Sequence, residues 1–229
     1  MWFDELAPDA SWSSLWNGYI ICGRCGGIRR YEGPCPGCGG DPLKCEELVV
    51  VLEDGTEERV LLAQMGAEGR YEDYVYLRLI EREWKRPLLA TDSIQGLGPG
   101  EPPSPRAAIV LLFWSYFETR IERLLRSGMT GSQPPLIDDA LDRYSSIGSR
   151  LDRLYRVVFG TTYGADLTDL GYGTVWSHLC ELQQRRNSFM HGSPGAVDDH
   201  LVERVVAEMK NEHESWIAIF NRHRPKPGA

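Results

Sequence analysis

Four of the six cysteines in this 229-residue chain occur as two pairs with the same spacing, Cys22-x2-Cys25 and Cys35-x2-Cys38. Two glycines follow each pair, and glycine permits the tight turn that brings two thiolates of one loop to one ion. The chain begins with an acidic segment, Met1–Glu5, and not with the apolar stretch of a secretory signal, so the spacing indicates a metal site and not a disulfide framework. Four thiolates saturate tetrahedral Zn²⁺, so we predict a structural zinc without an open position for water.

This cysteine pattern resembles a zinc ribbon, and the residues after it favour short strands. The apolar runs Leu48–Leu52 and Arg59–Leu62 flank a polar stretch with Asp54-Gly55, which is typical of a β-hairpin. Tyr74–Ile80 is a third strand candidate. We therefore predict a zinc ribbon with a small antiparallel β-sheet in residues 1–95.

A linker is expected next, because the segment from Gly96 to Pro105 is rich in glycine and proline and fits neither a helix nor a central strand. The composition changes across this segment, and we place the linker at residues 96–106 and a second domain at residues 107–224.

The second domain is predicted to be all-helical, because its apolar residues recur every three or four positions. The stripes are Val110, Phe113, Phe117, Ile121 and Leu124; Ile137, Leu141, Tyr144, Ile147, Leu151, Leu154 and Val158; Val175, Leu179, Leu182 and Phe189; and Leu201, Val205, Met209, Trp216 and Phe220. Such helices are enough to bury one bundle core. The predicted fold class is α+β, with the ribbon and sheet followed by a bundle of four to five helices.

The net charge of −8 argues against a protein that is held to nucleic acid by bulk electrostatics, so any RNA contact has to be local. The longest apolar run, Ala107–Trp114, is too short to cross a bilayer. We expect a soluble cytoplasmic protein without a membrane partner.

One stretch of the bundle, Gln183–Gly192, places polar residues where packing favours apolar ones. Arg186 falls on the apolar stripe of its helix, four residues after Leu182, and an arginine there is costly unless it is paired or lines a polar cleft. Asn187 and His191 are four residues apart and share one helix face. Glycine directly after His191 ends the helix and leaves that histidine near an open end.

This arrangement resembles the R-x4-6-H motif of the HEPN superfamily, small all-helical domains of which many are metal-independent endoribonucleases. A polar residue, commonly asparagine, often follows the arginine in that family, as Asn187 follows Arg186 here. The resemblance covers roughly residues 107–222. It implies a HEPN-like bundle, a homodimer whose two motifs face a shared cleft, and a toxin or antiviral defence effector with an antitoxin or defence-system protein as a possible partner.

The chemistry of the three residues suits RNA cleavage. The RNA 2′-hydroxyl attacks the adjacent phosphate once a base removes its proton, and histidine exchanges protons near neutral pH. His191 is the candidate acid/base, Arg186 stabilises the charge that develops on the phosphate, and Asn187 orients the phosphate or the imidazole. DNA lacks the 2′-hydroxyl and is not a substrate of this mechanism.

The alternative reading is a non-catalytic HEPN-like module that dimerises or binds nucleotides while the zinc ribbon recruits a protein partner. The ribbon itself either grips RNA through Arg24, Arg29, Arg30 and Tyr31 or docks a protein. Arginines also recur every third residue from Arg120 to Arg126; they either line an RNA path or form ordinary surface ion pairs.

Overall fold

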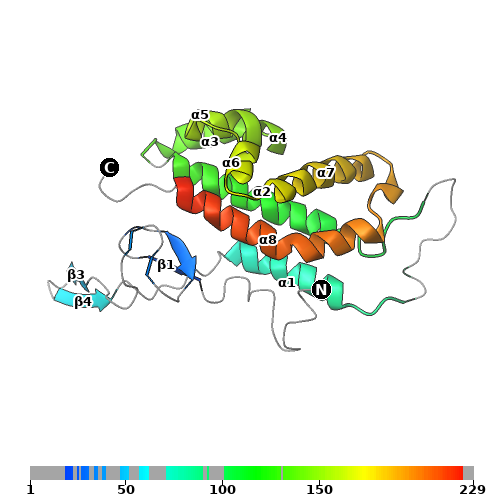
Figure 1. Ribbon diagram of the computed structural model, residues 1–229, viewed down its shortest axis with the longest axis horizontal. Coiled ribbons are helices and arrows are strands. Elements are labelled where there is room, and N and C mark those ends of the chain that lie inside the picture. The colour runs from blue at the N-terminus through cyan, green and yellow to red at the C-terminus, as the bar shows by residue number, and fades with distance from the viewer. Residues whose placement is uncertain are drawn as a thin grey trace.

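The structure is a computed structural model that describes residues 19–22, 25, 27–30, 34–35, 38–39, 47–51, 57–61, 71–89, 92, 101–129 and 131–223. Short strands lie in the N-terminal part, and helices follow from residue 71 onward (Figure 1). The strands are β1 (Tyr19–Ile21), β2 (Ile28–Arg30), β3 (Glu47–Val51) and β4 (Glu57–Leu61). The helices are α1 (Tyr71–Lys85), α2 (Ala108–Gly128), α3 (Pro134–Arg143), α4 (Ile147–Ser149), the π-helix η4 (Arg150–Leu154), α5 (Tyr155–Phe159), α6 (Tyr163–Asp169), α7 (Gly173–Met190), the 3₁₀ helix η5 (Pro194–Ala196) and α8 (Asp199–His223).

The strands form two antiparallel pairs. β1 pairs with β2, with Ile21 opposite Ile28, and Cys25 lies in the turn between them. β3 pairs with β4 in the region where a hairpin is predicted, with Val51 opposite Glu57. Within the described residues the two pairs are separate two-stranded sheets, so they do not join into one small sheet.

The predicted third strand at Tyr74–Ile80 is wrong, because these residues lie inside helix α1. Leu77 and Ile80 are fully buried, and Trp84 packs against the same core, so the apolar spacing is helical. The buried carboxylate of Asp73 accepts hydrogen bonds of 2.6 and 3.0 Å from Arg123 of α2. Helix α1, which precedes the predicted linker, therefore packs with the helices that follow it.

The helical body is built around α2, which contacts α1, α7 and α8. These four long helices lie side by side in Figure 1, and the shorter helices α3 to α6 gather at one end of them. Large aromatic side chains fill the interior; the largest fully buried ones include Trp114, Trp216, Tyr155 and Tyr163. The C-terminal part of the chain is thus helical, as the apolar stripes predict.

The predicted stripe from Ile137 to Val158 is divided among several short helices. Helix α3 ends near Tyr144, and Ser146 begins α4 by accepting a hydrogen bond from the Ser149 amide. A π-helical turn and α5 follow, and α5 ends at Gly160, whose φ of +78° lies in the left-handed region. A period of three or four residues runs through this region, but it does not show where the helix is interrupted.

The first strand pair is docked onto the C-terminal end of α8. The side-chain amide of Asn221 accepts a hydrogen bond of 2.8 Å from the Ile28 amide and donates one of 2.6 Å to the Ile28 carbonyl. The Ile28 side chain is buried in the same apolar core as the helices. Asn221 thus satisfies an open strand edge as a neighbouring strand would, and it fixes the cysteine-bearing segment to the helical body.

Candidate functional site

The sulfur atoms of Cys22, Cys25, Cys35 and Cys38 lie within 4.8 Å of one another. Cys22 Sγ is 3.8 Å from Cys38 Sγ, and Cys25 Sγ is 3.5 Å from Cys35 Sγ, so no disulfide bond joins these sulfur atoms. An ion with metal–sulfur bonds of about 2.3 Å in a tetrahedron places its ligand atoms about 3.8 Å apart. The four predicted ligands therefore form a candidate metal site.

Backbone turns bring the two cysteines of each pair together. The Cys22 amide donates to the Gly27 carbonyl over 2.8 Å, which closes the loop that contains Cys25. After the second pair, Gly39 has a φ of +67°, and its amide donates to the Cys35 carbonyl over 2.7 Å. A residue with a Cβ is strained at this φ, so the glycine after Cys38 is required by the turn.

The cluster is buried, and burial matters for its protonation. Burial, with smaller contributions from the neighbouring thiols of Cys35, Cys22 and Cys38, raises the pKa of the Cys25 thiol to about 11, although a backbone hydrogen bond with Gly27 opposes this rise. Without a bound ion, the cluster thus favours the neutral form of the Cys25 thiol near neutral pH. A bound cation reverses this preference, because its charge stabilises the thiolates.

The motif arginine lies on the buried face of α7, as its position on the apolar stripe predicts. Val175, Leu179 and Leu182 are buried there, and Arg186 follows on the same face with a half-buried side chain. One terminal nitrogen of Arg186 donates to Asn187 Oδ1 over 3.1 Å. Its Nε is buried and has no hydrogen-bond partner among the described residues, so the guanidinium keeps donors for a ligand.

His191 occupies the end of the same helix and has a different environment. Its amide donates to the Asn187 carbonyl over 3.0 Å, and Gly192, with a φ of +98°, then turns the chain away. The His191 side chain is exposed, and no contact between described residues joins its imidazole to Arg186 or Asn187. The structure thus brings Arg186 and Asn187 together and leaves His191 open to solvent one turn further on.

Sequence reasoning missed Arg185, which precedes the motif arginine. Its Nε donates to the Ala196 carbonyl over 2.8 Å, and its guanidinium forms an ion pair with Asp198. Asp198 also accepts a hydrogen bond of 2.8 Å from the Leu201 amide, which begins α8. The acidic start of α8 was visible in the sequence, but its pairing with Arg185 depends on how the chain folds back after His191.

The arginines Arg120, Arg123 and Arg126 each pair with an acidic side chain, and Arg120 is too deeply buried to line an RNA path. Arg120 is fully buried and forms an ion pair of 2.6 Å with the equally buried Glu212. Arg123 is bound to Asp73, and the more exposed Arg126 pairs with Glu122 and Asp138.

RNA binding by the ribbon stays a prediction for three of the four residues proposed for it. Arg29 is only 5% exposed and therefore does not present an open cationic surface. Arg24, Tyr31 and the side chain of Arg30 lie outside the described residues.

Cys180 lies beside Leu179 on the motif helix, and from this position small core packing is expected for its thiol. That expectation is wrong, because Cys180 is exposed on α7. It does not belong to the cysteine cluster.

None of the described helices is both long and apolar enough to span a bilayer. No family model matches the chain, and no curated protein and no solved structure matches it.

Proposed function

We propose that this chain is a metal-independent endoribonuclease of the HEPN type. The observation that carries the proposal is the half-buried guanidinium of Arg186, which contacts Asn187, has a buried Nε without a hydrogen-bond partner among the described residues, and lies five residues before the exposed His191. A cation that is only partly satisfied by the protein is suited to bind an anionic group of a ligand.

The proposed reaction uses the nucleophile that RNA itself carries. His191 removes the proton of the 2′-hydroxyl, and the 2′-oxygen forms a bond to the adjacent phosphorus. Arg186 donates hydrogen bonds to the phosphate oxygens while negative charge develops on them, and Asn187 orients the phosphate or the imidazole. The bond from phosphorus to the 5′-oxygen breaks, and a protonated histidine supplies the proton to that leaving group. The products are a 2′,3′-cyclic phosphate and a 5′-hydroxyl.

The position of the candidate metal ligands supports a mechanism in which no metal ion takes part in catalysis. Within the described ranges, the four cysteines are the only group of three or more ligand-type side chains that lie close enough together to hold an ion. They belong to the segment docked on α8 and not to the motif. We propose that they bind Zn²⁺, which with four thiolate ligands has a structural role.

The biological role that fits this chemistry is a toxin or antiviral defence effector whose partner is an antitoxin or another defence-system protein. RNA is the proposed substrate. The proposed active species is a homodimer, because one motif histidine per chain does not account for both the base and the acid.

The test is RNA cleavage by the purified protein in buffer that contains EDTA. We expect single-stranded or structured RNA to be cut, and we expect His191→Ala and Arg186→Ala each to lose most of the activity, by about 10²-fold or more. Arg186→Lys is expected to restore little, because a point charge does not reproduce two-pronged phosphate contact. Asn187→Ala is expected to cost less, since Asn187 only orients the reacting groups.

A matched control is His200→Ala, because His200 is an exposed histidine at the start of α8. It should cleave RNA at the parent rate. If His191→Ala cuts as fast as the parent, or if EDTA stops cleavage by a preparation free of other nucleases, the mechanism is wrong. The non-catalytic dimerisation or nucleotide-binding module then replaces it.

A further inference from the structure

The loop that connects α7 to α8 carries His191, and the structure fastens this loop far more tightly than its sequence suggests. We call residues 191–198 the motif loop and residues 101–106 the strap. The loop contains the exposed His191, the short helix η5 and Val197, which is fully buried in the main core. Its two ends are set by α7 and α8, and two further sets of contacts hold the residues between them.

The first set comes from Arg185, the residue before the motif arginine. Arg185 donates to the Ala196 carbonyl over 2.8 Å and pairs with the Asp198 carboxylate over 2.5 Å. One side chain of α7 thus binds two points of the loop that leaves the same helix. An arginine is suited to this task because its planar fork has donors at several fixed angles.

The second set comes from the strap. The Ser104 amide donates to the Val197 carbonyl over 2.7 Å, and the Ser104 hydroxyl donates to Asp199 Oδ1 over 2.6 Å. Ser104 is buried, so solvent competes little for these bonds. The strap also approaches the loop closely at Gly195, where an added Cβ would lie 2.6 Å from the Glu101 carbonyl oxygen.

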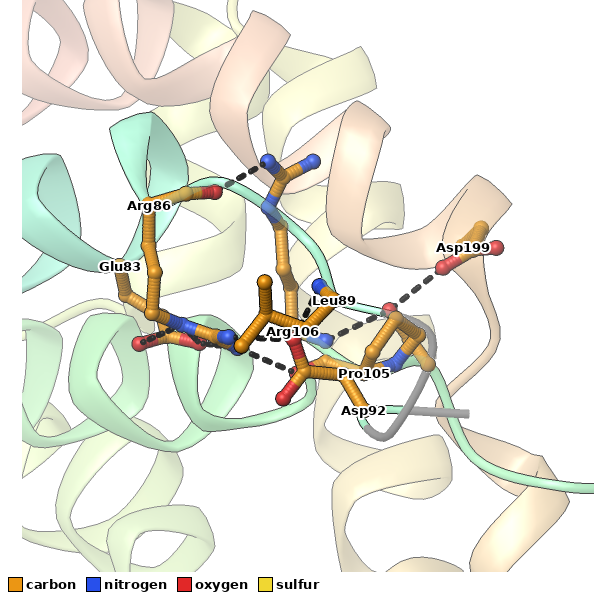
Figure 2. A network of polar contacts seen from close by, with 8 residues as sticks. Glu83, Arg86, Leu89, Asp92, Pro105, Arg106 and Asp199 are labelled. Carbon is orange, nitrogen blue, oxygen red and sulfur yellow. Dashed lines mark hydrogen bonds and ion pairs between the residues drawn. The ribbon is translucent and has the colours of Figure 1, made fainter. Parts of the chain in front are cut away.

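The strap is itself held by the end of α1, as Figure 2 shows. Arg106 donates to the Arg86 carbonyl over 3.1 Å and its guanidinium lies over the Trp84 ring at 5.0 Å. Arg86 donates to the Pro105 carbonyl over 3.3 Å and pairs with Glu83 and Asp92. The described part of the predicted linker is therefore a fixed connection between α1 and the motif loop.

We propose that Arg185 and the strap are positioning elements that hold the motif loop in one conformation and thereby place His191 relative to Arg186. The inference rests on the proposed function and deepens it. An exposed histidine without side-chain partners is positioned only by its backbone. A reacting group that is misplaced by about 1 Å can cost about 10²-fold in rate.

Gly195→Ala is the sharpest probe of the strap. Gly195 does not have a positive φ, so alanine suits the backbone, but its Cβ must displace the main chain of Glu101. Gly173→Ala is the matched control, because Gly173 begins α7, also lacks a positive φ, and an added Cβ there would lie 4.0 Å from its nearest neighbour, Thr168 Oγ1. Ser104→Ala and Arg185→Ala remove the two sets of contacts one at a time, and Arg185→Lys keeps the charge that faces Asp198.

The first measurement is amide hydrogen exchange on the full chain, which does not depend on activity. We expect the amides of Ser193, Ala196 and Val197 to exchange about tenfold faster or more in Gly195→Ala, Ser104→Ala and Arg185→Ala. The same amides in Gly173→Ala, and the interior amides of α2 in all variants, should keep the parent rates. The second measurement is RNA cleavage. We expect kcat to fall about tenfold or more with KM changed less than about twofold, and Arg185→Lys to recover part of kcat.

Unchanged exchange of the loop in Gly195→Ala and Ser104→Ala would overturn the inference. It is also overturned if the loop exchanges faster while kcat stays at the parent value. A parent that cleaves no RNA, or one that His191→Ala matches, refutes the proposed function instead. In that case, faster exchange in the variants still establishes that the strap and Arg185 hold the motif loop. Unchanged exchange would reject this role of the strap and Arg185 in addition to the proposed function.

Discussion

One of the buried histidines, His178, makes the stability of the helical body depend on pH. His178 of α7 is 8% exposed, and its two ring nitrogens have no hydrogen-bond partner among the described residues. Burial and the nearby charge of Arg204 lower its pKa from 6.5 to about 4, against smaller opposing effects of Glu208 and Glu181. The unfolded chain therefore binds a proton more tightly at this site than the folded protein does.

The sign of the effect follows from this difference. The contribution of neutral His178 to folding is fully present above pH 6.5 and declines as the pH falls toward about 4. Between pH values of about 7.5 and 5 we expect this residue to lower the free energy of unfolding by about 2 kcal/mol.

Urea unfolding of the parent and of His178→Gln at both pH values isolates this contribution. The variant should lose that part of the pH dependence, since glutamine does not titrate. Equal pH dependence in the two proteins would contradict the prediction. His200→Ala, which changes an exposed histidine, serves as the control.

The arginines of α2 show why residue type and spacing alone did not place individual side chains. Residues three apart on an α-helix are separated by about 300° of rotation, so each step of three moves about 60° around the axis. Arg120 accordingly faces the core and Arg126 faces solvent. The sequence shows a run of cations, but only the packing of α8 against α2 shows that one of them is matched by the buried Glu212.

At the level of secondary-structure elements, the sequence predicts those with one dominant signal. The long apolar stripes of α2 and α8 and the clustered cysteines belong to this kind. The segment Tyr74–Ile80 has two conflicting signals, because its aromatic and branched residues favour a strand while its buried positions follow a helical period. The strap and Arg185 were also missed, because neither set of contacts leaves a local pattern: Ser104 bonds to a residue 95 positions away, and Arg185 bonds to residues 11 and 13 positions away.

The clustered sulfur atoms of the two cysteine pairs lead to a prediction about metal content. We expect about one zinc per chain in freshly prepared protein, bound by the four thiolates. Cys25→Ser should lose most of this zinc, whereas Cys180→Ser should retain it, because Cys180 is exposed on α7 and outside the cluster. Elemental analysis measures both. Absence of bound metal, or disulfides among the four cysteines, would rule this site out.

Zinc removal should also change how the cysteine-bearing segment docks. Without the ion, the turn that presents Ile28 to Asn221 loses the thiolate–metal bonds that hold it closed. We expect the Ile28 amide to become exchange-labile after chelation, while the interior amides of α2 and α7 keep their protection. Simultaneous loss of protection in α2 would show that the metal supports the whole body and not the ribbon alone.

At the level of the whole molecule, the proposed chemistry needs more than one chain. One motif histidine, His191, serves as the base, and a second protonated histidine has to supply a proton to the leaving 5′-oxygen. A symmetric dimer provides it if the C-terminal ends of the two α7 helices meet near the two-fold axis. Met190, adjacent to His191, is 54% exposed and offers apolar surface for such a contact.

We therefore expect a dimer by light scattering, and we expect Met190→Lys to shift it toward the monomer and to lower RNA cleavage in parallel, because two added charges then face each other across the axis. Val157→Lys is the matched control: Val157 is 74% exposed, but it lies on α5, at the opposite end of the helical body from the end of α7 in Figure 1. It should remain dimeric and active. A strictly monomeric parent that cleaves RNA at its full rate would show that a single chain supplies both proton transfers. The acid would then have to be a group other than a second His191.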